Sequence, residues 1–175
     1  NTSMSTITFK GKPLQTVGLL PTVGSIAPEF TLTKTDLSEI NIKELRGYKV
    51  ILNIFPSLDT GVCAASVKTF DKRQDDIQGI KILCISADLP FAAGRFCEVG
   101  KIANIVHAST FRHGDFGEKF GVAIADGPLR GLMSRAVVAL DENGRIIYAE
   151  QVAEITDEPN YDAAIAAVRN SREKQ

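Results

Sequence analysis

Apolar residues follow two different spacings along the chain. Two stretches are almost continuously apolar, Lys49–Phe55 and Ile80–Ser86, which is typical of central strands buried on both faces. After Thr60, apolar positions instead recur every three or four residues as far as Ile77, which predicts a helix that ends near Gly79. The chain therefore has the strand–helix–strand alternation of an α/β protein.

Hairpins and shorter helices are predicted on either side of this core. A turn at Gly11–Pro13 joins two short strands near the start, and Asn143-Gly144 joins two more near the end. The remaining predicted elements are a strand at Glu29–Thr33, a strand and helical turn at Glu39–Leu45, a third buried strand at Asn104–Thr110, and helices at Pro90–Cys97, Asp115–Gly121 and Tyr161–Arg169. This order predicts a thioredoxin-like three-layer α/β sandwich with a mixed central sheet and an N-terminal β-hairpin extension.

No repeat, low-complexity tract or linker divides the chain, so we expect a single domain over residues 1–175. Residues 1–3, ahead of Met4, resemble a remnant of an expression vector. The glycine-rich segment Gly114–Gly131 is the least regular region. It contains no phosphate-binding fingerprint, because GxGxxG and GxxxxGK[ST] are both absent.

Charge and cysteine content narrow the class of protein. The net charge is −1, and the basic residues are scattered, so we expect no nucleic-acid or anionic-membrane surface. No apolar run approaches the roughly 18–20 residues that span a bilayer, and the N-terminus lacks the pattern of a secretion signal. Three cysteines are an odd number and too few for a disulfide scaffold. We therefore expect a cytoplasmic protein with reactive or buried thiols.

Cys63 lies where the first core strand gives way to a helix. The unpaired N–H groups of a first helical turn favour negative charge, and a thiol must ionise to act as a nucleophile. An unperturbed thiol, with a pKa near 8.5, is only about 3% ionised at pH 7. Complete ionisation therefore raises the fraction of reactive thiolate about thirtyfold at most. Since lowering a thiol pKa also lowers nucleophilicity, neighbouring groups must contribute the rest of any fast chemistry.

The neighbours of Cys63 suit one reaction. The Thr60 hydroxyl, three positions earlier, can face the sulfur or a bound oxygen, and Pro56 forms a rigid bend that can shield a thiolate. Arg135 directly precedes a later core strand whose end can lie beside the cysteine helix. A thiolate, a hydroxyl and a guanidinium together suit attack on the O–O bond of a peroxide. In this reaction the sulfur bonds to one oxygen, and negative charge grows on the other oxygen, which needs hydrogen-bond donors.

The pattern Pro56-x-x-x-Thr60-x-x-Cys63 resembles the active-site motif of the peroxiredoxins, P-x-x-x-(T/S)-x-x-C, which acts with a distant arginine. The stretches "LNIFPSLDTGVCAASV", "LCISADLPFAAGRFC" and "GVAIADGPLRGLMSRAVVALDENG" resemble the bacterial thiol peroxidases, an atypical two-cysteine subgroup. The resemblance runs from Ile7 to Val168 and includes the N-terminal hairpin.

This resemblance implies a role for each residue. Cys63 matches the peroxidatic cysteine, which a hydroperoxide oxidises to a sulfenic acid, and Cys97 matches the resolving cysteine, which then forms the intramolecular disulfide Cys63–Cys97. Thr60 and Arg135 match the residues that hold the thiolate and the peroxide, and Pro56 matches the shielding proline. The family reduces alkyl hydroperoxides and hydrogen peroxide, is recycled by thioredoxin, usually forms homodimers, and uses no metal or organic cofactor.

One conformational demand follows from the implied disulfide. Cys63 and Cys97 both lie in predicted helices, whereas a disulfide requires Cα atoms within about 7 Å. We therefore expect local unwinding in each catalytic cycle, with the segment "PFAAGRFC", which contains Gly94, as the first candidate to move.

Structural roles remain the simplest interpretation of several other residues. Cys84 lies inside a buried strand, where a small apolar side chain fits. A zinc site is not expected, because no two cysteines share a short ligand spacing and the histidines are not clustered. His107 and His113 are expected to be packing or surface residues, although a Cys-His hydrolase would need one of them beside Cys63. On local sequence alone, Arg135 could be a surface ion-pair partner.

Two other functions share the same cysteine. Cys63-Ala-Ala-Ser66 is a C-x-x-S sequence at a helix start, as in thiol–disulfide oxidoreductases, but serine replaces their usual second thiol. A non-enzymatic redox sensor would use the same thiols without turnover.

Asp59, Asp88 and Asp126 are interpreted as turn or capping residues. The apolar positions of "GVAIADGPLRGLM" could serve as loop core, dimer face or substrate pocket.

Overall fold

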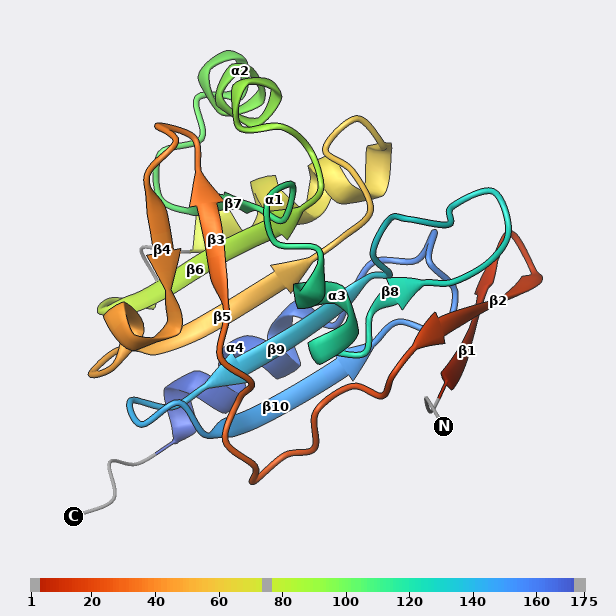
Figure 1. The fold of residues 1–175 in the computed structure, drawn as a ribbon. Helices are drawn as coiled ribbons and strands as arrows, with labels where there is room; N and C mark the ends of the chain where they lie inside the picture. The colour runs from red at the N-terminus through yellow and green to blue at the C-terminus, as the bar shows by residue number, and fades with distance from the viewer. Residues whose placement is uncertain (1–3, 74–76, 172–175) are drawn as a thin grey trace.

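The computed structural model describes residues 4–73 and 77–171, which fold into two sheets covered by helices (Figure 1). The larger sheet is made of seven strands: β3 (Thr31–Lys34), β4 (Glu39–Asn41), β5 (Lys49–Ile54), β6 (Ile80–Ser86), β7 (Val106–Ser109), β9 (Ala136–Leu140) and β10 (Ile146–Gln151). The helices are α1 (Gly61–Arg73), α2 (Pro90–Gly100), α3 (Asp115–Lys119) and α4 (Tyr161–Asn170), with a 3₁₀ turn η1 (Ile42–Leu45).

The middle of the large sheet is parallel and its flanks are antiparallel. Its spatial order is β10-β9-β5-β6-β7-β3-β4. β5, β6 and β7 run parallel, and α1 and α2 make the two crossovers between them. β9 and β10 add one antiparallel flank, and β3 and β4 add the other. The mixed sheet predicted from the sequence is confirmed.

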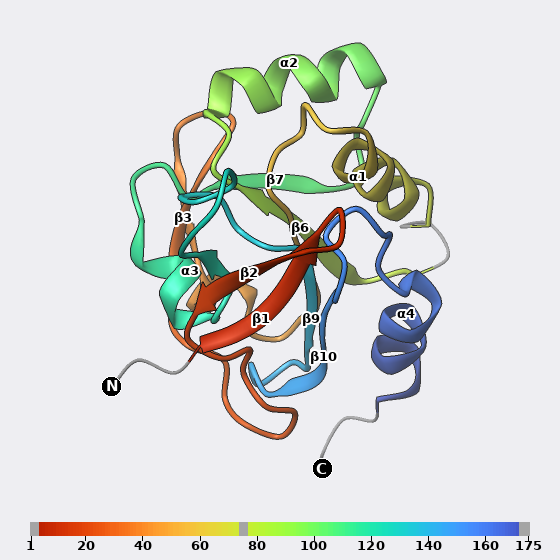
Figure 2. The same ribbon diagram turned by 90° about the vertical axis from the view of Figure 1, so that its right-hand side faces the viewer.

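Helices cover both faces of this sheet. In Figure 2, α1 and α4 lie on one side of the strands and α3 lies on the other. Successive side chains of a strand point to opposite faces, so β5 contributes to two buried clusters. Ile51 belongs to the cluster that includes Phe70 of α1, and Leu52 belongs to the cluster that includes Phe116 of α3. The predicted three layers are therefore present.

The N-terminal hairpin is also confirmed, but its turn was placed wrongly. β1 (Met4–Phe9) pairs with β2 (Lys12–Val17), so the turn is Lys10–Gly11 and Pro13 lies within β2. A two-residue hairpin turn of this kind needs a positive φ at both positions, and Lys10 and Gly11 have φ of 52° and 81°. Proline, whose ring fixes φ near −65°, cannot occupy such a position.

A short strand completes the small sheet. β8 (Ala123–Ile124) pairs with β2 and gives the order β1-β2-β8. It lies in the glycine-rich segment Gly114–Gly131, where no strand was predicted. A strand of two residues is too short to show an alternating pattern of apolar and polar positions. A buried cluster of Ile7, Leu14, Ile124 and Ile155 joins this sheet to the chain that follows β10.

The remaining predicted elements begin and end within about two or three residues of their expected bounds. The helix after Thr60 is described from Gly61 to Arg73, and residues 74–76, through which it was expected to continue, lie outside the described residues, as do residues 1–3. Within the described parts of the chain, no helix is long and apolar enough to cross a membrane.

Gly121 allows the N-terminal segment to pass close to the end of α3. Its φ is +67°, and a Cβ built on it would overlap the backbone carbonyl of Leu19. The position therefore requires glycine both for its backbone angle and for the space beside it.

We expect Gly121→Ala to destabilise the protein by about 3 kcal/mol or more, since backbone strain adds to an overlap with rigid main chain. Gly47→Ala is the matched control, because Gly47 also has a positive φ (+89°) but a Cβ added to it would meet no atom within 4 Å. It should cost only about 1–2 kcal/mol. Urea unfolding measures both, and equal losses would contradict this account of Gly121.

Candidate active site

Cys63 occupies the first turn of α1, as predicted. The helix begins at Gly61, and the Thr60 carbonyl accepts the Ala64 N–H at 3.0 Å. The N–H groups of this turn have no partner further back in the helix, so their partial positive charge faces the start of α1. The position favours negative charge on the Cys63 sulfur.

Arg135 reaches the cysteine from the neighbouring strand. The antiparallel register of β5 and β9 pairs Ile54 with Ala136, which brings Arg135 to the end of β5 where the active-site turn begins. Arg135 Nη2 lies 3.3 Å from Cys63 Sγ, and its Nε donates to the Ile155 carbonyl at 2.9 Å. The structure thus joins two residues that are far apart in the sequence.

The Arg135 guanidinium is buried, with only 2% of the residue exposed. A buried charge is costly unless an opposite charge or several hydrogen bonds compensate it. Among residues 4–73 and 77–171, no carboxylate forms an ion pair with Arg135, and Nη1 has no hydrogen-bond partner. The guanidinium hydrogen-bonds to the Ile155 carbonyl and to the Cys63 sulfur, so the sulfur is placed to compensate this buried group. The interpretation of Arg135 as a surface residue is wrong.

Packing sets the environment of the cysteine and corrects one expectation about Thr60. Cys63 is fully buried, because Val67 and Phe70 of the same helix and Phe55 pack in one cluster with it. Thr60 is exposed, and its hydroxyl donates to the Ser57 carbonyl at 3.0 Å instead of to the sulfur. The hydroxyl closes a local turn in this way, but its oxygen keeps its capacity to accept a hydrogen bond.

A pocket of about 380 Å³ opens beside the cysteine helix. Its lining comes from the active-site segment, from the hairpin and from two later loops. The lining residues are Phe9, Lys10, Pro56, Thr60, Gly61, Val62, Leu129, Leu132, Arg135, Ile155 and Thr156. Most of these side chains are apolar, and the charged ones are cations. Leu129 and Leu132 belong to the apolar segment for which the sequence left several roles open, and both line the same pocket as Arg135.

The other two cysteines lie in different environments. Cys97 is half-buried in α2, where burial and then the nearby Asp71 raise the pKa of its thiol. Cys84 is fully buried on β6, and burial raises its pKa to about 12. Asn53 Nδ2 donates to Cys84 Sγ at 3.6 Å. All three thiols are free, so the structure represents the reduced protein.

Comparison with known proteins identifies the family. The family model described as Redoxin matches residues 22–165. The thiol peroxidase of Mycobacterium tuberculosis (strain H37Rv) is 53% identical over 165 residues, which are 94% of this chain and 99% of that protein. This chain belongs to the thiol peroxidases of the redoxin family. The enzyme is a peroxiredoxin, and the resemblance seen in its sequence is confirmed.

Solved structures agree with this assignment. The crystal structure of a peroxiredoxin-like protein from Aquifex aeolicus matches with a TM-score of 0.89 and 40% identity, over 95% of this chain and 97% of that one. The thiol peroxidase from Chromobacterium violaceum, at 24% identity, has a TM-score of 0.83 over 90% and 91% of the two chains, which shows the shared fold. The thioredoxin-like fold predicted from the sequence is thereby confirmed.

Asp88 holds the active-site turn of this thiol peroxidase in place. Its carboxylate accepts hydrogen bonds from Ser57 Oγ (2.8 Å), the Leu58 N–H (2.8 Å) and Ser86 Oγ (2.6 Å). Both the N–H and the hydroxyl of Thr60 in turn donate to the Ser57 carbonyl. The sequence suggested only a turn or capping role for Asp88, because no local pattern shows that it contacts a segment 30 residues earlier.

His107 supports the same network without charge. Burial lowers its pKa to about 4, so the ring is neutral at physiological pH. Its Nε2 lies 2.9 Å from Ser86 Oγ, whose single proton is directed to Asp88, so Nε2 is the protonated nitrogen and donates. His113 pairs with Glu39 at 2.8 Å. Neither imidazole hydrogen-bonds to Cys63, which leaves no base for a Cys-His hydrolase.

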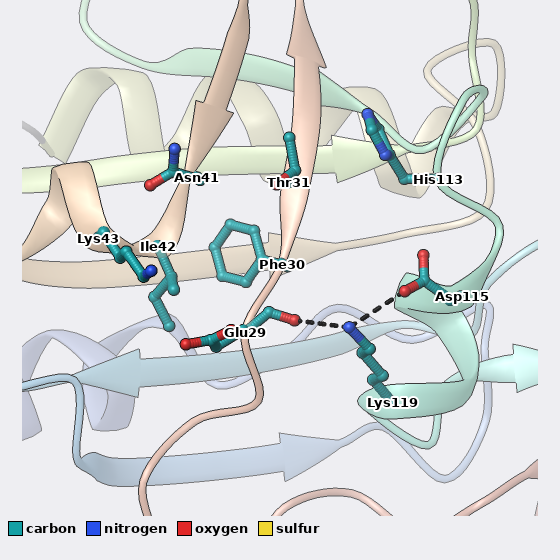
Figure 3. Close-up of a pocket in the computed structure, with 9 residues that line it drawn as sticks. All are labelled: Glu29, Phe30, Thr31, Asn41, Ile42, Lys43, His113, Asp115 and Lys119. Carbon is teal, nitrogen blue, oxygen red and sulfur yellow. Dashed lines mark hydrogen bonds and ion pairs between the residues drawn. The ribbon is translucent and has the colours of Figure 1, made fainter.

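A second hollow, of about 320 Å³, lies between η1, β3 and α3 (Figure 3). One of its lysines is already engaged, since Lys119 Nζ contacts both the Asp115 carboxylate (3.1 Å) and the Glu29 backbone carbonyl (3.1 Å). It contains no cysteine and shares no residue with the pocket at Arg135. Across the described parts of the chain, no group of three His, Cys, Asp or Glu side chains is arranged to hold a metal ion.

We expect Asp88→Asn to loosen the segment 57–60. Both carboxylate oxygens of Asp88 accept hydrogen bonds, and the asparagine NH₂ group that replaces one of them cannot accept. The stability should fall by about 1–3 kcal/mol, and amide hydrogen exchange of Leu58 and Thr60 should accelerate relative to β5. Asp59→Asn, which changes an exposed neighbouring carboxylate, serves as the control. Exchange that stays at the wild-type rate in Asp88→Asn would show that Asp88 does not hold this turn.

Proposed function

We propose that this thiol peroxidase reduces alkyl hydroperoxides and hydrogen peroxide through a sulfenic acid on Cys63. The Cys63 thiolate attacks the terminal oxygen of the hydroperoxide, the O–O bond breaks, and the sulfur becomes Cys63–SOH. The electron pair of the broken bond leaves on the alkoxide RO⁻, which takes up a proton to give the alcohol. The observation that carries the proposal is Arg135, which contacts the sulfur and also lines the pocket.

Arg135 is suited to both ends of this reaction. Nη2 donates toward Cys63 Sγ and stabilises its negative charge. Nη1, a buried donor with no partner among the described residues, can donate to a peroxide oxygen. Charge moves from sulfur to the leaving oxygen during attack, so a fixed guanidinium that faces both atoms stabilises the transition state without reorganising.

Thr60 and Pro56 complete the proposed site. The Thr60 hydroxyl already donates to Ser57, so toward the substrate it acts as an acceptor for the O–H of the hydroperoxide. Pro56 is buried and lines the pocket, which excludes water from one side of the bound peroxide. The apolar side chains of the pocket support an organic group on the substrate.

Cys97 is the proposed resolving residue. Its thiol attacks the sulfur of Cys63–SOH, the S–O bond breaks, and the disulfide Cys63–Cys97 and one water molecule form. The dithiol of thioredoxin then reduces the disulfide and is itself oxidised to a disulfide. We place this cycle in a homodimer without a metal or organic cofactor, as the family resemblance implies, and in the cytoplasm, as the low cysteine content favours.

The C-x-x-S sequence does not favour a thiol–disulfide oxidoreductase. Ser66 is fully buried, accepts from Asn53 Nδ2 at 3.1 Å and donates to the Cys63 carbonyl at 2.8 Å. It ties the first turn of α1 to the central strand. The Ser66 hydroxyl thus has a structural role, and it cannot replace the second redox-active thiol of a thiol–disulfide oxidoreductase.

Cysteine variants test the proposed roles, with thioredoxin-coupled peroxide consumption as the measurement. Cys63→Ser should abolish turnover, because no nucleophile remains. Cys97→Ser should also lose coupled turnover but still form a sulfenic acid on Cys63 that dimedone traps. Cys84→Ser should stay close to wild type. Stoichiometric oxidation of the wild type without turnover would instead indicate a redox sensor, and an active Cys97→Ser would remove Cys97 from the cycle.

We expect the disulfide to form from a second conformation of α2, because Cys63 and Cys97 both lie in formed helices. Pro90–Gly100 is a formed helix in the reduced protein and contains Gly94, which lowers helix stability by about 1 kcal/mol relative to alanine. We expect amides of residues 90–100 to exchange faster in the Cys63–Cys97 oxidised protein than in the reduced one, with β5 and β6 unchanged. Identical exchange of this segment in both states would contradict the proposed movement.

A further inference from the structure

Glu154 directly precedes two residues that line the pocket, Ile155 and Thr156, and it binds two separate segments. Its carboxylate accepts five hydrogen bonds: from Thr8 Oγ1 (3.0 Å), the Lys10 N–H (3.2 Å), the Gly11 N–H (2.8 Å), the Thr156 N–H (3.0 Å) and Thr156 Oγ1 (2.7 Å). The donors belong to the N-terminal hairpin and to the loop after β10. One side chain therefore holds the tip of the hairpin against this loop.

The hairpin turn needs such an anchor. Lys10 has a left-handed backbone (φ 52°), which is unfavourable for a residue with a side chain, and the usual residues at this position are Asn, Asp and Gly. Two successive left-handed residues direct both of their N–H groups to the same side, which creates a site for an anion. The Glu154 carboxylate occupies this site and so compensates the unfavourable turn.

The carboxylate remains charged at every physiological pH. Hydrogen bonds from the backbone N–H of Thr156 and then that of Gly11 lower its pKa to about 2. Since the folded-state pKa is lowered, the contacts are strongest above the ordinary pKa of a glutamate and weaken only as the pH falls toward 2. The anchor is thus permanent under working conditions.

The residues on both sides of this anchor form the substrate pocket. Phe9 and Lys10 of the hairpin, and Ile155 and Thr156 of the loop, all line it. The backbone continues the same contact, because the Thr8 N–H donates to the Ala153 carbonyl and the Ile155 N–H donates to the Thr8 carbonyl, at 2.7 and 2.9 Å. The part of the lining that comes from the hairpin and from this loop is therefore held together by the Glu154 carboxylate and by these backbone hydrogen bonds.

We propose that Glu154 is a positioning residue that sets the selectivity of the pocket for organic hydroperoxides over hydrogen peroxide. The inference rests on the proposed peroxidase function of the same pocket. An organic group must contact the wall that carries Phe9 and Ile155, and it binds more weakly when the wall is loose. Hydrogen peroxide has no organic group and depends on the residues around Cys63 (Arg135, Thr60 and Pro56), so its reaction is much less sensitive to the hairpin and the loop.

The test is the ratio of the second-order rate constant for oxidation of Cys63 by cumene hydroperoxide to that for hydrogen peroxide, compared between Glu154→Gln and the wild type. The neutral amide presents an NH₂ group to several donors, so the tip of the hairpin loosens. We expect the ratio to fall about tenfold, through a lower rate constant for cumene hydroperoxide. Because the chain has no Trp, single-turnover oxidation of Cys63 should be followed by rapid quench, alkylation and mass spectrometry, which needs no reductant.

Two further variants separate this role from a general effect. Asp157→Asn removes a neighbouring exposed carboxylate on the same loop and should leave the ratio unchanged. Glu154→Asp keeps the charge and should recover part of the selectivity. Amide exchange at Lys10 and Gly11 should accelerate in Glu154→Gln.

The outcomes also distinguish the inference from the proposed function. An unchanged ratio in Glu154→Gln, or an equal loss with both peroxides, would overturn the role of Glu154. A wild-type protein that oxidises Cys63 with neither peroxide would instead overturn the proposed function itself.

Discussion

The contact between the Arg135 guanidinium and the Cys63 sulfur is the interaction on which the site depends. Both groups are buried, and Arg135 has no carboxylate partner among the described residues. Because a buried charge must be paired, we propose that this one contact both stabilises a reactive Cys63 sulfur and makes the buried arginine tolerable. The β5–β9 register and the start of α1 at the end of β5 are what bring the two groups together.

Carboxylates that accept several hydrogen bonds hold the surroundings of this pair. Asp88 binds the turn that precedes α1, and Glu154 binds the hairpin that closes the other side of the pocket. Each accepts from N–H and O–H groups of segments distant in sequence, rather than from a lysine or arginine. Such contacts fix direction as well as distance, which suits a site where a peroxide must be aligned with sulfur and guanidinium.

Much of the fold follows from the order of apolar patterns, and the sequence is informative where those patterns are long. β5 and β6 are continuous apolar runs, α1 has a clear helical period, and all three lie where predicted. The motif around Cys63 indicated the family. β8 was missed because two residues carry no period, and the first hairpin turn was misplaced because Pro13, a typical turn residue, lies in a strand. The direction of the Thr60 hydroxyl and the burial of Cys63 depend on packing that no local pattern records. Asp88 and Glu154 act through contacts with segments far away along the chain, which a single sequence does not reveal.

The most direct test of the account is the single-turnover rate constant for oxidation of Cys63 by hydrogen peroxide in Arg135→Met. Methionine fills much of the same space but removes every donor. The account predicts a rate constant about 10²–10³-fold below that of the wild type, the size expected when a donor to a developing oxyanion is lost. A variant that keeps its fold by circular dichroism and reacts within a fewfold of the wild-type rate would contradict the role assigned to Arg135.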